Sequence, residues 1–482
     1  MFITRLPEEI LAYIFTYLHW ADTSRSARVC RAWQPLAFDN PFYWRDIAIN
    51  AGDLNAKALA FHWRRLSAGG SKPIHFGIQY LGRSNWVESQ LIPMLRAAAP
   101  RAKEIYLTVH SVYRGEVEWA LCPTGGAPHL ENFLINYKTQ GQPHLDYYMP
   151  LGKYLEDKIL RCGPDEEPSS VTAPYPLRCA MIYNVMMPST RIASLESVTE
   201  LWFNNVWNTH MDDFPWFLFD CSPNMRHLRI AGGAIYFRSA PYSLERLNQL
   251  RALETLDIRF QNDTMRAMFT HLPLHELKEL YLVCADRDTI YSHALSTIGH
   301  PEIIEITTGE DGVEFNITVR CYESSVVRHF VEPKSNYFPD SEETNVLLTD
   351  CFIDLIVELR IQTSIWSFVH PWLPREKSAP PESAPCYPTL PRLVVDIDSE
   401  SPHVVRLPME SLSLPKLETL VLKGTSDEYG FVRVDARDVV AFANRLTTEP
   451  LILELCGAIV GPNSYGVLLS RFREVHTNHP WL

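Results

Sequence analysis

The sequence lacks cysteine pairs at the spacings that hold metal ions or disulfide frameworks. Its ten cysteines are scattered over 482 residues, and the two closest in sequence are Cys162 and Cys179. Structural metal sites use much closer pairs, and small secreted domains use dense sets of cysteines. We therefore expect reduced cysteines in the core, with no metal ion and no cofactor.

Excess positive charge and long apolar runs are also missing. The 44 basic and 57 acidic residues give a formal charge of −13, which argues against general binding to nucleic acid phosphates. No apolar run approaches the length of a membrane span, and the N-terminus lacks the layout of a secretory signal. With 46% hydrophobic residues, we expect a folded protein in the cytoplasm, the nucleus or both, with neither nucleic acid nor membrane as a partner.

Motifs that carry catalysis are missing as well. The sequence contains no HExxH, GxSxG or P-loop pattern, and Gly69-Gly70-Ser71-Lys72 lacks the spacing that cradles a phosphate. Nothing in the sequence places a nucleophile beside a base, although histidines and carboxylates are plentiful. The position of Cys30 on an apolar helix face favours a packed residue over a reactive thiol. We expect no catalytic site and no enzyme activity of the chain itself.

The N-terminal segment begins with a strong helix signal. Pro7 suits the first turn of a helix, and Glu8 and Glu9 complement the positive end of the helix dipole. Apolar residues then recur with helical spacing and predict one apolar stripe. The stripe consists of Ile10, Ile14 and Leu18, with Leu11 and Phe15 alongside.

Two more helices are predicted before residue 50. Asp22 is a good N-cap for a second helix, and Trp44 with Ile47 indicates a short third helix after Pro41. Three such helices are too few to bury all their apolar faces, so some faces should contact a partner. The second helix would carry one shared apolar face, formed by Val29, Cys30, Trp33 and Leu36.

These residues closely resemble the F-box family over residues 4–49. Two tryptophans, one cysteine and two prolines at the family spacing make the resemblance specific. Thr23 and Ser26 depart from it, because the family usually has leucine-like residues there, and Pro35 interrupts the end of the predicted second helix. The matching residues are Leu6, Pro7, Glu9, Ile10, Ile14, Leu18, Val29, Cys30, Arg31, Trp33, Pro41 and Trp44.

The F-box resemblance implies binding to the Skp-type adaptor of a cullin-RING ubiquitin ligase. The residues implied to form or support the adaptor interface are Leu6, Pro7, Ile10, Ile14, Leu18, Val29, Cys30, Trp33 and Trp44. A purely structural role, as a helical cap on the following domain, is the alternative.

A degenerate repeat of the form apolar-x-x-apolar-x-apolar fills much of the remaining sequence. Middle positions of the clearest copies are Leu201, Leu228, Leu256 and Leu280, which step by 27, 28 and 24 residues. This spacing is typical of leucine-rich repeats, at roughly 20–29 residues. Weaker copies are centred on Ile105, Phe133, Ala180, Leu393, Leu420 and Leu453.

Each copy predicts one short strand whose alternate residues point into a shared core. Helical spacing between copies, as in residues 242–250, predicts helices on the opposite side. The pattern resembles the leucine-rich-repeat family, but Val206, Gly233, Gln261 and Ala285 replace its usual Asn or Cys.

The combination of the two patterns resembles F-box proteins of a fungal type with a degenerate leucine-rich-repeat domain. The predicted fold is α/β: a three-helix F-box followed by an irregular leucine-rich-repeat solenoid, or horseshoe. An ordinary α/β domain with leucine-rich strands is the alternative.

The predicted domains are an F-box at 1–50, a helical linker or cap at 51–100, and the repeat domain at 101–482. Loops are predicted at 163–175 and 374–391, where proline and polar residues replace apolar periodicity. The region 305–372 fits the repeat poorly and is left unassigned. Within it, strict alternation from Val313 to Val319 predicts a half-buried strand, and Cys351 to Leu359 fits either a strand or a buried helix.

Residues flanking the inward leucines should lie on the open face of the stacked strands, where repeat proteins bind partners. Aromatic and arginine side chains among them favour an interface, whereas charge pairs such as Arg229 with Asp257 would favour an ordinary solvated face. The predicted substrate-binding residues are Trp202, Asn204, His227, Arg229, Asp257, Arg259, Glu279 and Tyr281.

Together these observations favour a substrate-recognition subunit of a Skp/cullin/F-box (SCF) type E3 ubiquitin ligase. The F-box would dock on the adaptor, and the repeat domain would bind an unknown protein substrate. A non-ligase assembly protein that uses the same adaptor is the alternative, and a stand-alone enzyme is disfavoured by the missing motifs.

Overall fold

The computed structural model forms two compact units, Met1–Leu253 and Glu254–Leu482. The described residues are 6–18, 20–51, 55–80, 82–121, 127–138, 177–183, 185, 195–211, 214–235, 242–260, 271–283, 294–295, 298, 301–309, 314–322, 325–333, 355–370, 386–398, 405–425, 431–461 and 464–478.

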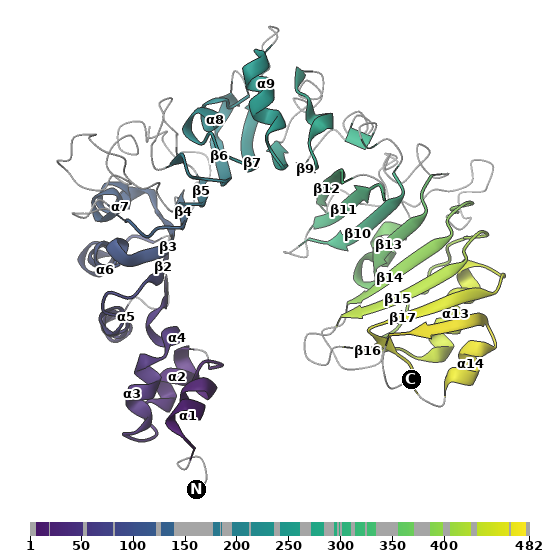
Figure 1. The fold of residues 1–482 in the computed structure, drawn as a ribbon, viewed down its shortest axis with the longest axis horizontal. Helices are drawn as coiled ribbons and strands as arrows, with labels where there is room; N and C mark the ends of the chain where they lie inside the picture. The colour runs from purple at the N-terminus through teal and green to yellow at the C-terminus, as the bar shows by residue number, and fades with distance from the viewer. Residues whose placement is uncertain are drawn as a thin grey trace. The chain divides into compact units, whose positions relative to one another are not determined.

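The first unit begins with short helices and continues as strands that alternate with helices (Figure 1). Its helices are α1 (Glu8–Phe15), α2 (Trp20–Ser26), α3 (Trp33–Asp39), α4 (Pro41–Trp44), α5 (Ala56–Ala68), α6 (Ile92–Ala98), α7 (Arg114–Leu121), α8 (Phe217–Cys221) and α9 (Leu244–Arg251), with a π-helical turn at Val87–Leu91. Its strands are β1 (Asp46–Asn50), β2 (Ile74–Tyr80), β3 (Ala102–His110), β4 (Asn132–Lys138), β5 (Cys179–Tyr183), β6 (Glu200–Met211) and β7 (His227–Ile235).

Strands β1 to β7 pair in chain order, and every pair is parallel. Apolar residues at matching positions of successive strands form a buried row across the sheet, because parallel strands in register stack equivalent side chains. Figure 1 shows α5, α6 and α7 along one side of β2, β3 and β4. The buried row consists of Ile47, Phe76, Ile105, Phe133, Ala180, Leu201 and Leu228.

The predicted second helix is wrong, because two helices replace it. Asp22 lies inside α2 and pairs with Arg25 at 2.8 Å instead of capping the helix. Helix α2 ends at Ser26, and α3 starts at Trp33 with Pro35 in its first turn. A proline ring clashes with the carbonyl four residues earlier, so one helix cannot run through Pro35, whereas a first turn accepts it.

The predicted short third helix after Pro41 is present as α4, but it ends before Ile47. Helix α4 ends at Trp44, and Ile47 lies in strand β1, where Ile47 and Ile49 alternate with outward residues. The two β-branched residues at a spacing of two fit a pleated, half-buried strand. The helices expected between residues 51 and 100 are present as α5 and α6, but the sheet also passes through this range as β2.

The described residues of the second unit form a mostly parallel sheet, a separate two-stranded parallel sheet and helices. Its strands are β8 (Thr255–Phe260), β9 (Glu279–Val283), β10 (Ile303–Thr308), β11 (Glu314–Arg320), β12 (Val327–Pro333), β13 (Glu358–Gln362), β14 (Arg392–Asp398), β15 (Thr419–Thr425), β16 (Val432–Arg433), β17 (Leu451–Cys456), β18 (Ala458–Ile459) and β19 (Phe472–Thr477). Its helices are α12 (Trp366–Val369), α13 (Ala436–Leu446) and α14 (Tyr465–Leu469), with 3-10 turns at Leu274–Glu276 and Thr363–Ile365.

An antiparallel meander interrupts the parallel order of the second unit. Strand β9 pairs with β12, and β12, β11 and β10 follow one another in reverse chain order. Strand β10 then pairs in parallel with β13, and the parallel series continues through β14, β15, β17 and β19. Because β11 runs against its neighbours, the meander interrupts the repeat within residues 305–372.

The meander places a charged residue in the buried row. Arg328 is paired with Leu280 of β9 and is fully buried. Its guanidinium donates to the carbonyls of Leu277, Val327 and His275 at 3.1, 2.9 and 3.4 Å. Burial lowers the pKa of Arg328 to about 10, so the group remains charged near neutral pH.

The strand predictions agree with the structure at every copy of the repeat pattern. The copies centred on Ile105 to Leu280 and on Leu393 to Leu453 all lie in parallel strands. Phe315, Ile317 and Val319 are buried in β11 as their alternation predicts, and the segment ending at Leu359 reaches strand β13. The predicted loop at 163–175, most of the loop at 374–391, Val313, Gln261 and Ala285 lie outside the described residues.

Candidate functional site

Helix α1 has two apolar faces, and only one is buried. Leu11 and Phe15 pack inward, and the centres of the Phe15 and Trp33 rings lie 5.4 Å apart. Ile10 and Ile14 are 46% and 41% exposed on the other face. The predicted single stripe is therefore divided, because the helix buries the arc through Leu11 and Phe15 and leaves the neighbouring arc open.

The predicted adaptor-binding residues fall into three groups by exposure. Leu6, Pro7, Ile10, Ile14 and Val29 are exposed, so their apolar surface is open to a partner. Leu18 and Trp33 are half-buried and pack on the core of the helices, and Cys30 is half-buried. Trp44 is buried. Exposed apolar residues gathered on one element mark interaction surfaces more often than single ones do.

Two exposed tyrosines extend this surface, and sequence reasoning missed them. Tyr13 and Tyr17 are 61% and 71% exposed, and their hydroxyl groups are hydrogen-bonded to each other. Their rings meet edge to face at 5.1 Å. Positions 13 and 17 continue the helical spacing of Ile10 and Ile14, so the same periodicity could have identified them. We call Leu6, Ile10, Tyr13, Ile14 and Tyr17 the open α1 face.

Buried contacts fix these helices to the sheet within the first unit. Arg65 of α5 is fully buried and donates to the carbonyls of Tyr43 and Asp46 at 2.5 Å each. The Lys72 ammonium lies 4.8 Å from the centre of the Trp44 ring and 3.2 Å from Asp39. Trp44 thus packs between the helices and the strands. The joint between the N-terminal helices and the sheet is held by buried contacts.

The outward face of β6 and β7 carries four predicted substrate-binding residues: Trp202, Asn204, His227 and Arg229. All four are partly exposed, and the pairing places Trp202 beside Arg229. The Arg229 guanidinium lies over the Trp202 ring at 4.7 Å, and the Trp202 indole donates to Glu200 at 2.8 Å. The two side chains form a cation–π pair on the surface.

The other four predicted residues lie on β8 and β9 of the second unit. Asp257 is buried and accepts a hydrogen bond from Arg259 at 3.1 Å, whereas Arg259, Glu279 and Tyr281 are partly exposed. The Tyr281 hydroxyl donates to Glu279 at 2.8 Å. Tyr281 also stacks on His329 of β12, with ring centres 3.9 Å apart.

The cluster around Glu279 shifts two pKa values downward. Burial raises the pKa of Glu279, but hydrogen bonds from Tyr281 and Thr255, together with His329, outweigh it and lower the pKa overall. Burial lowers the pKa of His329 despite the opposing effect of Glu279. Glu279 is therefore charged and His329 neutral near pH 7.

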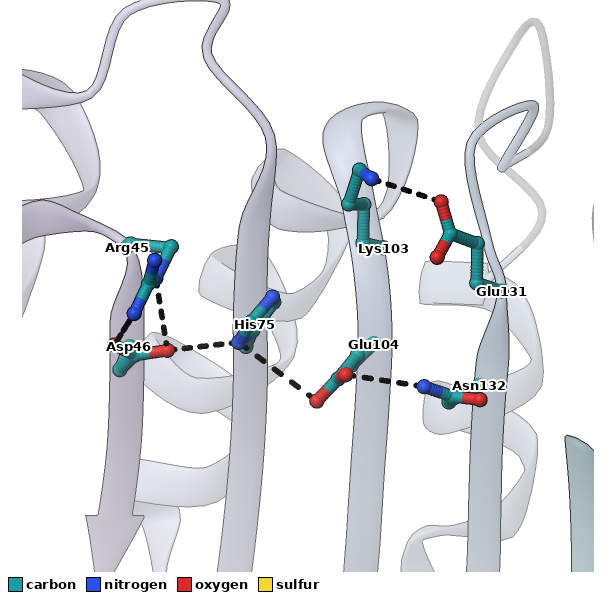
Figure 2. A network of polar contacts seen from close by, with 7 residues as sticks. All are labelled: Arg45, Asp46, His75, Lys103, Glu104, Glu131 and Asn132. Atoms are coloured by element: carbon teal, nitrogen blue, oxygen red, sulfur yellow. Dashed lines mark hydrogen bonds and ion pairs between the residues drawn. The ribbon is translucent and has the colours of Figure 1, made fainter. Parts of the chain in front are cut away.

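A further polar network, absent from the prediction, crosses the outward face of β1 to β4 (Figure 2). Asp46 lies 2.7 Å from Nδ1 of His75, and the same nitrogen lies 3.7 Å from Glu104. Asn132 donates to Glu104 at 3.0 Å, and Arg45 donates to Asp46 at 3.1 Å. In Figure 2 these side chains come from four neighbouring strands, beside a separate Lys103–Glu131 pair at 2.8 Å.

This network borders a shallow hollow of about 360 Å³ on the same face. Ala48 and Gly77 are neighbours across β1 and β2 and line the hollow with almost no side chain. Tyr106 and Leu134 follow on β3 and β4. No repeat copy was recognised at β1 or β2, so the sequence did not predict that the outward face continues onto these two strands. Trp44-x-x-Ile47-x-Ile49 has the same spacing and could have shown it.

Metal-binding and thiol chemistry gain no support from the described part of the chain. No group of three or more His, Cys, Asp or Glu side chains within it could hold a metal ion. Burial raises the pKa of the Cys179 thiol to about 12 and that of Cys221 to about 11, so both thiols stay protonated. Across the same residues, no helix combines the length and hydropathy of a membrane span.

Comparison with known proteins identifies the N-terminal helices. A family model described as F-box-like matches residues 3–50, which include the open α1 face and end at β1. No curated protein matches the chain. The chain thus carries an F-box-like domain joined by buried contacts to a large, mostly parallel sheet.

Proposed function

We propose that this F-box-bearing chain is the substrate-recognition subunit of an SCF type E3 ubiquitin ligase. The F-box would dock on a Skp-type adaptor, which links it to a cullin-RING ligase in the cytoplasm or nucleus. The sheet would hold a protein substrate. The chain would contribute position and not catalysis, because holding a substrate near a charged conjugating enzyme raises the effective concentration of its lysines.

The observation that carries this proposal is the open α1 face within the segment that matches the F-box-like model. The chain leaves Ile10, Tyr13, Ile14 and Tyr17 uncovered although the other face of the same helix is packed. Covering such an apolar surface with a partner is favourable in proportion to the area removed from water.

The strand pattern supports the second half of the proposal. Parallel strands in register, with helices between them, are what a degenerate leucine-rich-repeat solenoid requires. We propose this arrangement for the sheet, with its outward face as the substrate surface. In the first unit the Arg229–Trp202 pair would contact the bound protein, and in the second unit the Glu279 cluster would do so.

The test is co-expression of the full chain with a Skp-type adaptor and a cullin. The wild type should recover both partners, and the variant Ile10→Ser/Ile14→Ser should lose both. Val112→Ser, which changes an apolar residue of the same unit that is 49% exposed, should behave as the wild type. Recovery of adaptor without cullin would instead indicate a non-ligase assembly protein, and equal recovery by the double variant would exclude docking through α1.

A further inference from the structure

The hollow on β1 to β4 lies over two neighbouring strand residues with little or no side chain, Ala48 and Gly77. Gly77 lies in the middle of β2, and its φ is outside the left-handed region that favours glycine. A Cβ atom added there would meet its nearest neighbours at 3.7–3.9 Å, which is ordinary contact. Neither the backbone nor the packing requires glycine, yet glycine weakens a strand interior relative to alanine.

Strand glycines without a backbone reason often mark a place where a ligand approaches closely. Here the outward row of the sheet runs from Ala48 through Gly77 to Tyr106, so the two smallest residues stand beside an aromatic ring. The space above them, about 360 Å³, is large enough to hold one large side chain with room to spare. The bottom of the hollow, at Ala48 and Gly77, is apolar, and one edge, at Asp46 and His75, is polar.

A carboxylate lies beside the hollow, close to the tyrosine. Glu104 and Tyr106 are two positions apart on β3, and Glu104 accepts a hydrogen bond from Asn132 at 3.0 Å. This donor is neutral, and the nearest basic side chain among the described residues, His75, lies 3.7 Å from Glu104. Asp46 adds a second carboxylate on the other side of His75, as Figure 2 shows, and it also pairs with Arg45 at 3.1 Å, so one arginine of this chain already pairs with one of the two carboxylates.

The same outward row contains a second aromatic ring, which is covered by an arginine of this chain. On β6 and β7 the chain places the Arg229 guanidinium over the Trp202 ring, with Glu200 holding the indole. The hollow offers an aromatic ring and a carboxylate in a comparable arrangement, but Gly77 supplies no cation. A guanidinium from outside the chain would complete the same combination of contacts.

We infer that the hollow over Ala48 and Gly77 binds an arginine side chain of the protein substrate. The aliphatic part of that arginine lies on the small residues, and its guanidinium stacks on Tyr106 and pairs with Glu104 and Asp46. The inference depends on the proposed function only for the claim that the arginine belongs to a substrate.

The test measures binding of the peptide acetyl-Gly-Gly-Arg-Gly-Gly-amide to the full chain by ligand-observed NMR. Saturable binding is expected, with affinity at least tenfold higher than for the same peptide with citrulline, which keeps the shape and removes the charge. Gly77→Leu fills the hollow and should abolish binding, whereas Gly466→Ala, at a glycine with open space around it, should leave binding unchanged. Glu104→Gln should weaken it at least fivefold and covers the case in which Gly77→Leu fails to fold.

Absence of saturable binding up to 5 mM peptide (about −3 kcal/mol in binding free energy) would overturn the inference. So would equal affinity for the citrulline peptide, or unchanged binding by folded Gly77→Leu. Adaptor recovery is measured on the same preparations. If the adaptor binds and the peptide does not, arginine binding in the hollow is excluded and the proposed receptor role stands. If the peptide binds and the adaptor does not, arginine binding in the hollow stands and the receptor role is excluded.

Discussion

Ile14 and Phe15 are adjacent in sequence and lie on neighbouring faces of α1, about 100° apart around the helix. Phe15 is 2% exposed and packs on Trp33, so Phe15→Ala should lower the free energy of unfolding of the first unit by about 3–5 kcal/mol. Ile14→Ser should change it by less than about 0.5 kcal/mol, because Ile14 is already open to water. Urea unfolding followed by tryptophan fluorescence measures both. A large loss of stability in Ile14→Ser would mean that this face is buried.

His329 makes stability depend on pH. Its pKa in the folded protein is lowered by burial, and by Arg320, against the opposing effects of Glu279 and Glu305. In the unfolded chain, His329 is protonated near pH 6.5, whereas in the folded chain it is protonated only at lower pH. The free energy of unfolding therefore falls as the pH drops from about 7 to 5. His329→Gln should make this fall smaller.

The measurement is thermal or urea unfolding of the second unit at several pH values. His275→Gln is the matched control, because His275 is an exposed histidine of the same unit. It should retain the pH dependence of the wild type. An unchanged slope in His329→Gln would show that His329 does not cause the loss of stability.

Single-residue exposure was the least predictable property of the candidate site. Helical spacing correctly marked α1 as apolar, but Ile10 and Leu11 both fit the stripe, and only packing decides which is buried. The same holds for Trp44, which serves as an internal support. The role of Gly77 was invisible too, because the hollow depends on the neighbours that three other strands bring beside it.

At the level of elements, Arg65 joins the F-box-like helices to the sheet. Its guanidinium satisfies the carbonyls of Tyr43 and Asp46, and Arg65→Met would leave both without this donor. We expect a loss of about 1–3 kcal/mol in the first unit. Arg64→Met, at the exposed neighbouring position, should cost less than about 0.5 kcal/mol.

Hydrogen exchange tests where that loss occurs. Amides of α4 and β1 should exchange faster in Arg65→Met than in Arg64→Met, because the joint opens before the rest of the unit. Equal protection in the two variants would show that Trp44 and its neighbours hold the joint without the buried arginine.

The strands were largely predictable and their order was not. Each repeat copy has local spacing that reports a strand, and the unrecognised strands β1, β10 and β13 have it too, as in Pro301-x-x-Ile304-x-Ile306 and Ile356-x-x-Leu359-x-Ile361. The reversed order of β10, β11 and β12 depends on pairing between distant segments. Nothing in a local pattern of apolar residues specifies which strands become neighbours.

At the level of the whole molecule, β1 belongs both to the segment that matches the F-box-like model and to the sheet. A chain that starts at residue 51 would lose β1 and expose the paired edge of β2, with its buried Ile74, Phe76 and Ile78. Uncovered strand edges promote aggregation. We expect this shortened chain to elute as aggregates in size-exclusion chromatography, whereas Ile10→Ser/Ile14→Ser elutes as the wild type. Elution of the shortened chain as a stable single species would show that β1 is dispensable for the sheet.

The most direct test of the central claim is hydrogen exchange of the full chain with and without a Skp-type adaptor. We expect protection to increase along α1 and around Val29, and to stay unchanged on β6 to β9, which the proposed function reserves for the substrate. Protection on the sheet without protection on α1, or no protection at all, would contradict the account.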